Sequence, residues 1–127
     1  MNLDAWAPRV LSLTRAVAGL LFLLHGTQKF FSFPTRAAPN APELFSMIGA
    51  AGTIEIVCGA LIMVGLFTRP AAFLASGLMA FAYFIAHAPR NLFPTLNGGD
   101  AAILFCFFFF YLVFAGPGVW SLDGRRR

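Results

Sequence analysis

The first residues that could do chemistry are a histidine and a lysine four positions apart. His25 and Lys29 end an apolar run that begins near Val10. On an α-helix this spacing places both side chains on one face, one turn apart. Ionisable groups in a membrane-spanning helix are costly, and they usually face a protein interior or a pore. The pair therefore predicts a polar site, provided that the run crosses a membrane.

Other polar side chains lie in the later apolar segments. Glu55 is inside the second segment, His87 is near the end of the third, and Asp100 opens the fourth. In a chain of antiparallel hairpins these ends meet near one membrane surface, where they could line a pocket. Asp100 could cap its helix or pair with Lys29. The candidate ligand-binding residues are His25, Gln28, Lys29, Glu55, His87, Asn97 and Asp100.

The composition indicates an integral membrane protein. Hydrophobic residues make up 59% of the 127 residues and charged residues only 11%, and the mean hydropathy is +0.78. Soluble domains are about a quarter charged. The 16 phenylalanines leave too little polar surface to cover a soluble globule. Because each crossing needs about 20 apolar residues, the chain has room for at most four.

The elements that must position the polar residues are four helices. We predict an all-α integral membrane protein, a four-helix bundle with antiparallel up-down topology. It forms a single transmembrane domain over residues 1–127. The very short link at 65–70 makes the second and third helices a tight hairpin, and the proline-rich segment 32–42 is a loop. The expected spans are 8–31, 44–67, 71–88 and 100–115.

The basic residues predict that both termini lie in the cytoplasm. With four spans, Arg9, Arg69 and the tail 125–127 share one side of the membrane. The other side keeps Arg36, Arg90 and Lys29. The side with the excess of Lys and Arg is usually cytoplasmic. The arginine tail is a topology anchor in this interpretation, and we expect no binding of nucleic acid.

An arginine and a glutamate lie inside the predicted spans. Arg15 is about seven residues, roughly 10 Å, from the cytoplasmic start of the first span. Glu55 is about eleven residues, roughly 16 Å, from the outer start of the second. In a core of about 30 Å these depths nearly coincide. We therefore expect a buried Arg15–Glu55 ion pair.

Structural explanations compete with a functional site. Lys29 could extend to the headgroups, Asp100 could only cap its helix, and each histidine could be a hydrogen-bonded structural group. A metal centre from His25, His87, Glu55 and Asp100 is not favoured, because these residues share no motif and Lys29 would repel a cation. The two cysteines lack a C-x-x-C spacing, and we interpret them as packing residues. The role of the run 105–110 is open between lipid contact and helix contact.

The chain resembles the DoxX family of small bacterial four-helix membrane proteins. The likeness extends from about Val10 to Asp123. It is carried by the pattern from Arg15 to Leu24 with His25-Gly26-Thr27-Gln28-Lys29-Phe30, by Gly52-Thr53-Ile54-Glu55 and Gly59, by Gly65-Leu66-Phe67-Thr68-Arg69-Pro70-Ala71-Ala72, and by Asn97-Gly98-Gly99-Asp100.

The resemblance implies a multi-pass protein of the bacterial inner membrane associated with redox chemistry. Similar proteins have been linked to membrane oxidoreductase systems, including quinone-reducing thiosulfate oxidoreductases. We expect a redox-associated subunit that binds quinone or a similar small apolar ligand and is not catalytic alone, because no flavin, haem or reactive cysteine motif is present. Membrane or peripheral redox proteins, and further copies of the chain, are possible partners. The alternative is a non-catalytic assembly subunit. Solute transport is disfavoured, since the sequence has no inverted repeat with broken helices.

Overall fold

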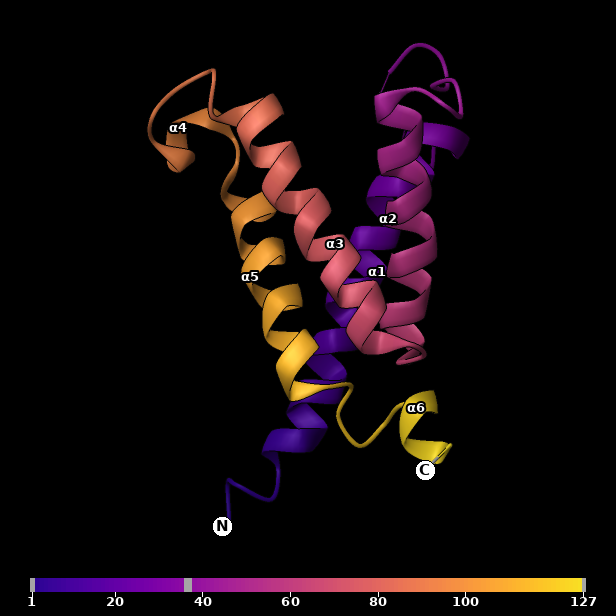
Figure 1. Cartoon of the computed structure of the whole chain (residues 1–127), viewed down its shortest axis with the longest axis vertical. Coiled ribbons are helices and arrows are strands. Elements are labelled where there is room, and N and C mark those ends of the chain that lie inside the picture. Colours follow the sequence, from indigo (N-terminus) through magenta and orange to yellow (C-terminus); the bar gives the residue numbers. More distant parts are fainter. Residues whose placement is uncertain (1, 36–37, 127) are drawn as a thin grey trace.

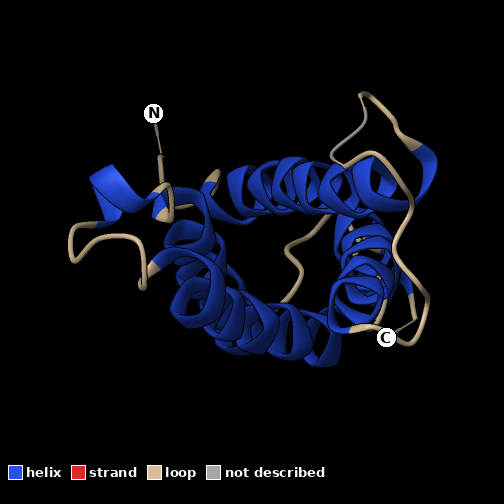
Figure 2. Cartoon of the chain, turned by 90° about the horizontal axis from the view of Figure 1, so that it is seen from above, coloured by secondary structure: helices blue, strands red, loops and turns tan. Residues whose placement is uncertain are grey.

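The computed structural model describes residues 2–35 and 38–126. Arg36, which we expected on the outer side, and Arg127 of the tail lie outside the described residues. The described chain is built from helices and loops, without a strand (Figure 2). The helical elements are α1 (Ala7–Phe31), α2 (Met47–Val64), α3 (Thr68–Ala82), the π-helical turn η1 (Tyr83–His87), α4 (Pro94–Asn97), α5 (Asp100–Ala115) and α6 (Leu122–Arg125).

The predicted all-helical membrane architecture is confirmed. Three helical segments are long and apolar enough to cross a membrane: Ala7–Phe31, Met47–Val64 and Thr68–His87. The fourth apolar helix, Asp100–Ala115, has 16 residues, or about 24 Å at the helical rise. It is shorter than the other three. Segments of this kind place the protein in contact with the lipid bilayer.

The long helices alternate in direction and form two pairs (Figure 1). Helix α1 packs along α2, and α3 packs along α5. The turn at 65–67 joins the pairs at the end where both termini lie, and the pairs diverge towards the other end (Figure 1). Gly65 and Phe67 in this turn have φ of 72° and 48°. Helices α2 and α3 are therefore farther apart at that end than at the turn that joins them (Figure 1).

Glycines bring α1 and α2 into backbone contact. A Cβ atom on Gly59 would lie 2.6 Å from the backbone nitrogen of Leu23, and one on Gly26 would lie 2.8 Å from the carbonyl oxygen of Gly52. No side chain fits there without separating the helices. The buried positions of α1 are Ser12, Arg15, Gly19, Phe22 and Gly26, which recur at the 3.6-residue period and so share one face of the helix.

Phenylalanine rings join the two helix pairs. Phe22 of α1 and Phe109 of α5 are both fully buried, and their ring centroids are 5.0 Å apart in an edge-on arrangement. Phe105 lies 5.8 Å from Phe22. Small residues of α3, among them Ala72 and Ala75, are fully buried in the same core. The core therefore lies at the middle of the molecule and separates its two ends.

Arg15 is buried at the end where the pairs converge, and its guanidinium group donates to four backbone carbonyls. Nη1 donates to Ile62 and Met63 at the end of α2, at 2.6 and 2.8 Å. Nε donates to Pro117 at 2.8 Å, and Nη2 donates to Trp120 at 2.5 Å. The last carbonyls of a helix have no partner inside it, so a cation there satisfies them. Arg15 thus ties α1 to the end of α2 and to the C-terminal segment.

The expected Arg15–Glu55 ion pair is wrong. Gly59 lies against Leu23 and Gly52 against Phe30, so Glu55 lies opposite about residue 27 of α1. Arg15 is 12 residues away from that level, or about 18 Å. The depth estimate took the ends of the two helices as level. In the structure α1 extends beyond the C-terminal end of α2, so Arg15 lies level with the end of α2.

Asp123 fastens the C-terminal segment to the start of α3. Its carboxylate accepts hydrogen bonds from the backbone nitrogens of Phe67 and Thr68, both at 2.9 Å. Partial burial opposes ionisation of this group, but the two N–H donors and the charge of Arg126 outweigh it, and the pKa of Asp123 lies below its ordinary value. We call Arg15, Asp123 and the segment 116–126 the clasped end.

Candidate functional site

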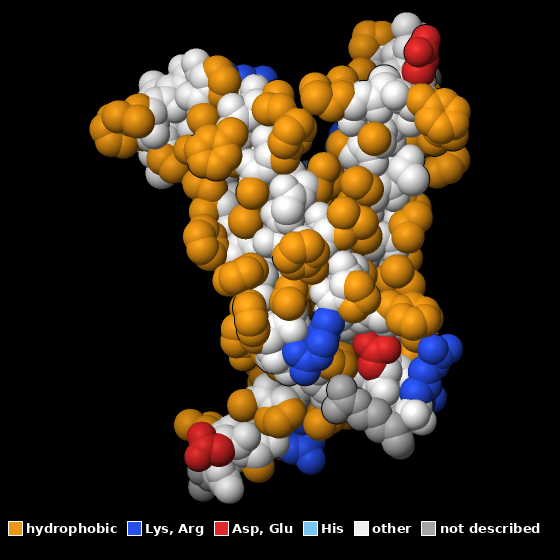
Figure 3. Space-filling model, in the orientation of Figure 1, with side chains coloured by type: hydrophobic (Ala, Val, Ile, Leu, Met, Phe, Trp, Pro, Cys, Tyr) orange, Lys and Arg blue, Asp and Glu red, His pale blue; other side chains and the backbone are white. Residues whose placement is uncertain are grey.

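The opposite end of the molecule holds a pocket of about 430 Å³ between the two helix pairs. Figure 3 shows the surface hollowed between two arms at this end. We call it the pocket end. Several apolar wall residues on α2 and α3 are largely exposed, among them Met47 at 60% and Phe81 at 54%. The wall consists of His25, Lys29, Met47, Ile48, Ala51, Glu55, Leu78, Met79, Phe81, Ala82, Ile85, Ala86, His87, Gly98, Ala101, Ala102 and Phe105.

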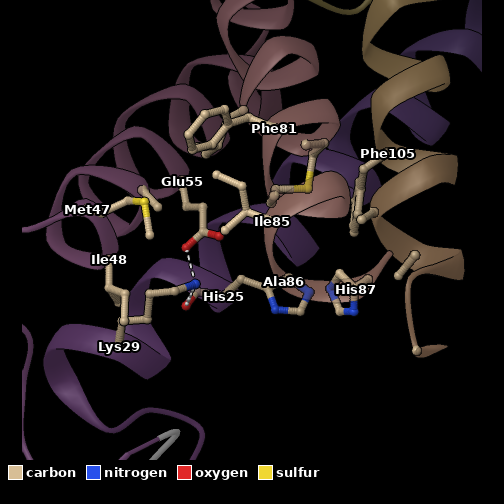
Figure 4. A pocket seen from close by; sticks show the side chains of 17 residues that line it. His25, Lys29, Met47, Ile48, Glu55, Phe81, Ile85, Ala86, His87 and Phe105 are labelled. Atoms are coloured by element: carbon tan, nitrogen blue, oxygen red, sulfur yellow. Dashed lines mark hydrogen bonds and ion pairs between the residues drawn. The ribbon is translucent and has the colours of Figure 1, made fainter. Parts of the chain in front are cut away.

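An ion pair forms one side of the pocket. Lys29 of α1 donates to Oε2 of Glu55 in α2 at 2.6 Å (Figure 4). The Glu55 side chain is 6% exposed and the Lys29 side chain 25% exposed. The close approach of Gly52 to Lys29 and Phe30 sets this meeting of the helices. Each charge neutralises the other where neither would be stable alone.

His25 lies one helical turn before Lys29 and also lines the pocket. Its ring meets Phe105 of α5 edge-on, with centroids 6.1 Å apart and planes at 89°. The residue is exposed rather than buried in the protein core. Figure 4 shows His25 and His87 along the same side of the pocket, beyond the Glu55 carboxylate. The expected convergence of the two histidines with Lys29 and Glu55 is therefore present in the geometry.

His87 enters the pocket from a π-helical turn at the end of the third span. Its Nδ1 lies 3.1 Å from the backbone carbonyl oxygen of Asn97. The ring also stacks on Tyr83, with centroids 6.4 Å apart and planes at 25°. Because a π-turn inserts one residue into the helix, it turns the side chains that follow. The turn and the two contacts fix how His87 faces the pocket.

Asn97 supports the pocket without lining it. Its buried side chain donates to the Tyr83 hydroxyl at 3.2 Å and to the Asn91 carbonyl at 3.1 Å, and it accepts from the Gly99 nitrogen at 2.8 Å. These bonds hold the loop 88–99 against η1. A buried amide with this many partners is well satisfied.

Gln28 and Asp100 do not lie in the pocket wall. Gln28 is half-buried, and Asp100 is exposed at the first turn of α5. Asp100 is not the partner of Lys29, which pairs with Glu55 instead. The residue at the N-cap of α5 is Gly99, so Asp100 makes no side-chain cap and contributes only its charge near the helix start.

The individual residues of the apolar wall could not be identified from the sequence. Phe105 divides its contacts between His25 and the core, and Phe109 is fully buried, whereas Phe107 of the same run is 68% exposed. Within the run, Phe105 therefore lines the pocket, Phe109 lies in the core and Phe107 is exposed at the surface. Tyr83 also shapes the pocket, because it contacts the His87 ring and accepts a hydrogen bond from Asn97. Its spacing of four from His87 is the signal that could have joined the two.

The described residues contain no group of three or more His, Cys, Asp or Glu side chains that could hold a metal ion. The polar groups of the pocket can instead donate and accept hydrogen bonds and exchange protons, inside a largely apolar wall. Such a combination is typical of sites for small apolar molecules that carry a few polar atoms. Any electron transfer would need a ligand or a partner to supply the redox chemistry.

Comparison with known proteins gives the family. A protein of Haemophilus influenzae described as uncharacterized is 42% identical over 128 residues, covering 98% of this chain and 96% of its own length. An uncharacterized membrane protein of Mycobacterium tuberculosis is 31% identical over 149 residues, covering 97% of this chain and 85% of its own length. No solved structure matches significantly. The DoxX family model matches residues 10–88, which include the Lys29–Glu55 pair and both histidines, and the chain belongs to the DoxX family.

Proposed function

We propose that this protein binds a small apolar molecule carrying one or two oxygen atoms, of which a quinone is the type. The observation that carries the proposal is the pocket of about 430 Å³, in which His25, His87 and the Lys29–Glu55 pair meet an apolar wall. Ionisable residues inside a membrane protein are by default candidates for function.

The position of the opening supports entry from the bilayer. The wall residues Met47, Ile48, Phe81 and Ile85 lie on exposed surfaces of α2 and of the third span. In a membrane these surfaces contact lipid. A molecule dissolved in the lipid can therefore reach the pocket between the diverging helices without crossing water. Its volume suits a ring system, and a long isoprenoid tail would remain in the lipid.

We further propose the setting in which this binding takes place. The four long helices form an antiparallel bundle in the bacterial inner membrane. The clasped end faces the cytoplasm, since the chain termini, Arg9, Arg69 and Arg125 lie there. The pocket then opens near the outer leaflet. The protein serves a redox system as a ligand-holding subunit, with the donor or acceptor of electrons on a partner protein.

The test is the molecule that the protein retains. Native membrane is dispersed with a copolymer that keeps the lipids in place, the protein is purified, and its extract is analysed by mass spectrometry. We expect a quinone or related molecule close to one per chain, above its level in the surrounding lipid. A ratio of quinone to lipid equal to that of the surrounding membrane, together with stable co-purification of other membrane proteins, would overturn the proposal. The protein would then be an assembly subunit.

Two neighbouring alanines of α2 provide a matched pair of variants. Ala51 lines the pocket, whereas Ala50 is exposed and does not. Ala51→Phe fills the pocket with a ring and is expected to remove the retained molecule. Ala50→Phe makes the same chemical change towards lipid and is expected to leave the retained amount unchanged. Equal retention by both variants would place the molecule outside the pocket.

A further inference from the structure

The hydrogen bond between His87 and Asn97 fixes which ring nitrogen of His87 carries the proton. A backbone carbonyl oxygen can only accept a hydrogen bond. At 3.1 Å from the Asn97 oxygen, Nδ1 must therefore be the donor. In a neutral imidazole the other nitrogen, Nε2, is then an acceptor. No hydrogen bond to Nε2 is found among the residues that the structure describes.

The groups that hold His87 in this tautomer are themselves fixed in place. The Asn97 side chain is bound to Tyr83, Asn91 and Gly99, so the peptide that presents the carbonyl is fixed in place. Stacking on Tyr83 restricts the rotation of the His87 ring. A ring flip would put Cδ2 in place of Nδ1, and the other tautomer would put an unprotonated nitrogen there, and either change would lose the bond to the carbonyl. His87 therefore presents a fixed acceptor.

The carboxylate on the opposite helix pair is also an acceptor. Lys29 binds Oε2 of Glu55, and Oε1 has no hydrogen-bond donor among the described residues. Two of the three N–H donors of the Lys29 ammonium group point to this carboxylate and, at 3.5 Å, to the His25 carbonyl. Each helix pair therefore carries at the pocket an acceptor without a donor among the described residues, Nε2 of His87 on one and Oε1 of Glu55 on the other.

We infer that the pocket selects a ligand that donates a hydrogen bond, a phenol or hydroquinone, over the corresponding quinone or ether, and that His87 Nε2 is the acceptor. This inference rests on the proposed function, because it specifies the chemical form of the ligand in the same pocket. An acceptor facing a quinone carbonyl would leave both lone pairs unpaired in an apolar site, whereas a hydroxyl satisfies it. His87 is accordingly a specificity residue for the hydroxylated form.

The test compares two probes that differ in one donor, 1-naphthol and 1-methoxynaphthalene. Binding is measured by equilibrium dialysis against lipid nanodiscs with the protein, and empty nanodiscs correct for partitioning. We expect naphthol to bind about tenfold more tightly, the contribution of one hydrogen bond. His87→Phe is expected to abolish the preference, and Ala50→Phe, which adds a ring outside the pocket wall, to keep it. A preference that survives in His87→Phe would overturn the inference.

A second measurement needs no variant and does not depend on variant folding. The chain has two histidines, so nitrogen-15 labelling of histidine gives few resonances. We expect His87 to show a protonated Nδ1 and an unprotonated Nε2, and the Nε2 resonance to move with naphthol and not with the methyl ether. A protonated Nε2 would refute the inference. Equal binding of both probes refutes it while leaving the proposed function standing, whereas no binding of either probe refutes the proposed function as well.

Discussion

The two ends of this molecule use buried charge in opposite ways. At the clasped end, Arg15 is 2% exposed and donates to four backbone carbonyls, two at the end of α2 and two in the segment 116–126. At the pocket end, Lys29 and Glu55 form an ion pair, and one acceptor atom on each of Glu55 and His87 has no donor among the described residues and lies beside a cavity. A charge whose hydrogen-bonding capacity is used up by the backbone stabilises the fold. A charge with capacity left beside a cavity can serve a ligand.

The difference does not lie in the presence of a hollow. A second hollow of about 600 Å³ lies beside the clasped end, lined by Val64, Val119, Trp120, Ser121, Leu122 and Arg125. No histidine or carboxylate is among these residues, and the Trp120 carbonyl already accepts from Arg15. The pocket end differs because its open polar atoms converge inside an apolar wall.

The largest effect is expected from Arg15→Ala. The change leaves the carbonyls of Ile62, Met63, Pro117 and Trp120 without their donor and opens a cavity, so we expect a loss of about 3–5 kcal/mol in the free energy of unfolding. Arg9→Ala is the control, since Arg9 is exposed near the start of the same helix, and its effect should stay within about 0.5 kcal/mol. Thermal unfolding in detergent measures both. Similar losses of stability in the two variants would contradict the stabilising role that we assign to Arg15 at the clasped end.

A glycine in the α1–α2 contact tests the register that places both ends. Gly59→Ala brings a Cβ against the Leu23 backbone, where neither helix can give way, and we expect it to cost about 1–3 kcal/mol. Gly77→Ala makes the same change on α3, where nothing lies within 4 Å. That variant should be neutral or more stable by up to about 1 kcal/mol. A neutral Gly59→Ala would mean that the helices are farther apart than in the structure.

The ion pair of the pocket end is expected to contribute less than Arg15. In a double-mutant cycle with Lys29→Met and Glu55→Gln, we expect a coupling free energy of about 1 kcal/mol, because the lysine is partly exposed. The corresponding cycle with Glu43→Gln, an exposed carboxylate of the preceding loop, should show no coupling with Lys29. Coupling of Lys29 to Glu43 rather than to Glu55 would contradict the pairing and with it the geometry of the pocket.

The smallest effect concerns pH and the clasped end. The folded state lowers the pKa of Asp123, so its ionised form adds stability above the ordinary carboxyl pKa of about 3.9. That contribution is lost as the pH falls through the folded-state pKa. We expect Asp123→Asn to be about 1 kcal/mol less stable than the unchanged protein at pH 6. Thermal unfolding between pH 6 and pH 3 should show that the stability of this variant depends less on pH. In Asp4→Asn, an exposed carboxylate, the dependence should persist.

The features that depend on a single helix could be predicted from the sequence. Arg15, Gly19, Phe22 and Gly26 recur at the 3.6-residue period, which predicts that they share one face of α1, and the glycines around Glu55 share one face of α2 in the same way. Glycines on such faces also predict a close helix contact. The position of one helix relative to its neighbour along the bundle axis could not be predicted from the sequence. Without it, Arg15 was paired with a glutamate about 18 Å away along the bundle.

The pocket itself depends on features that carry no local signal. The π-turn at Tyr83–His87 decides where His87 points, and periodicity in the sequence does not reveal an inserted residue. The partners of Arg15 are backbone carbonyls, which every sequence contains. The role of Asp123 required knowing that α6 folds back beneath α3, and the run 105–110 had no single role to predict because successive rings face core, pocket and surface.

The most direct test of the contrast between the ends is photolabelling with an apolar probe that carries a diazirine and a phenol. The protein in nanodiscs is labelled with and without excess unlabelled phenol, and the labelled peptides are identified by mass spectrometry. We predict labelling at 47–55 and 78–87 that the competitor abolishes, and labelling elsewhere that the competitor does not change. Competitor-sensitive labelling around Val64, Trp120 and Leu122, or none at the pocket end, would contradict it.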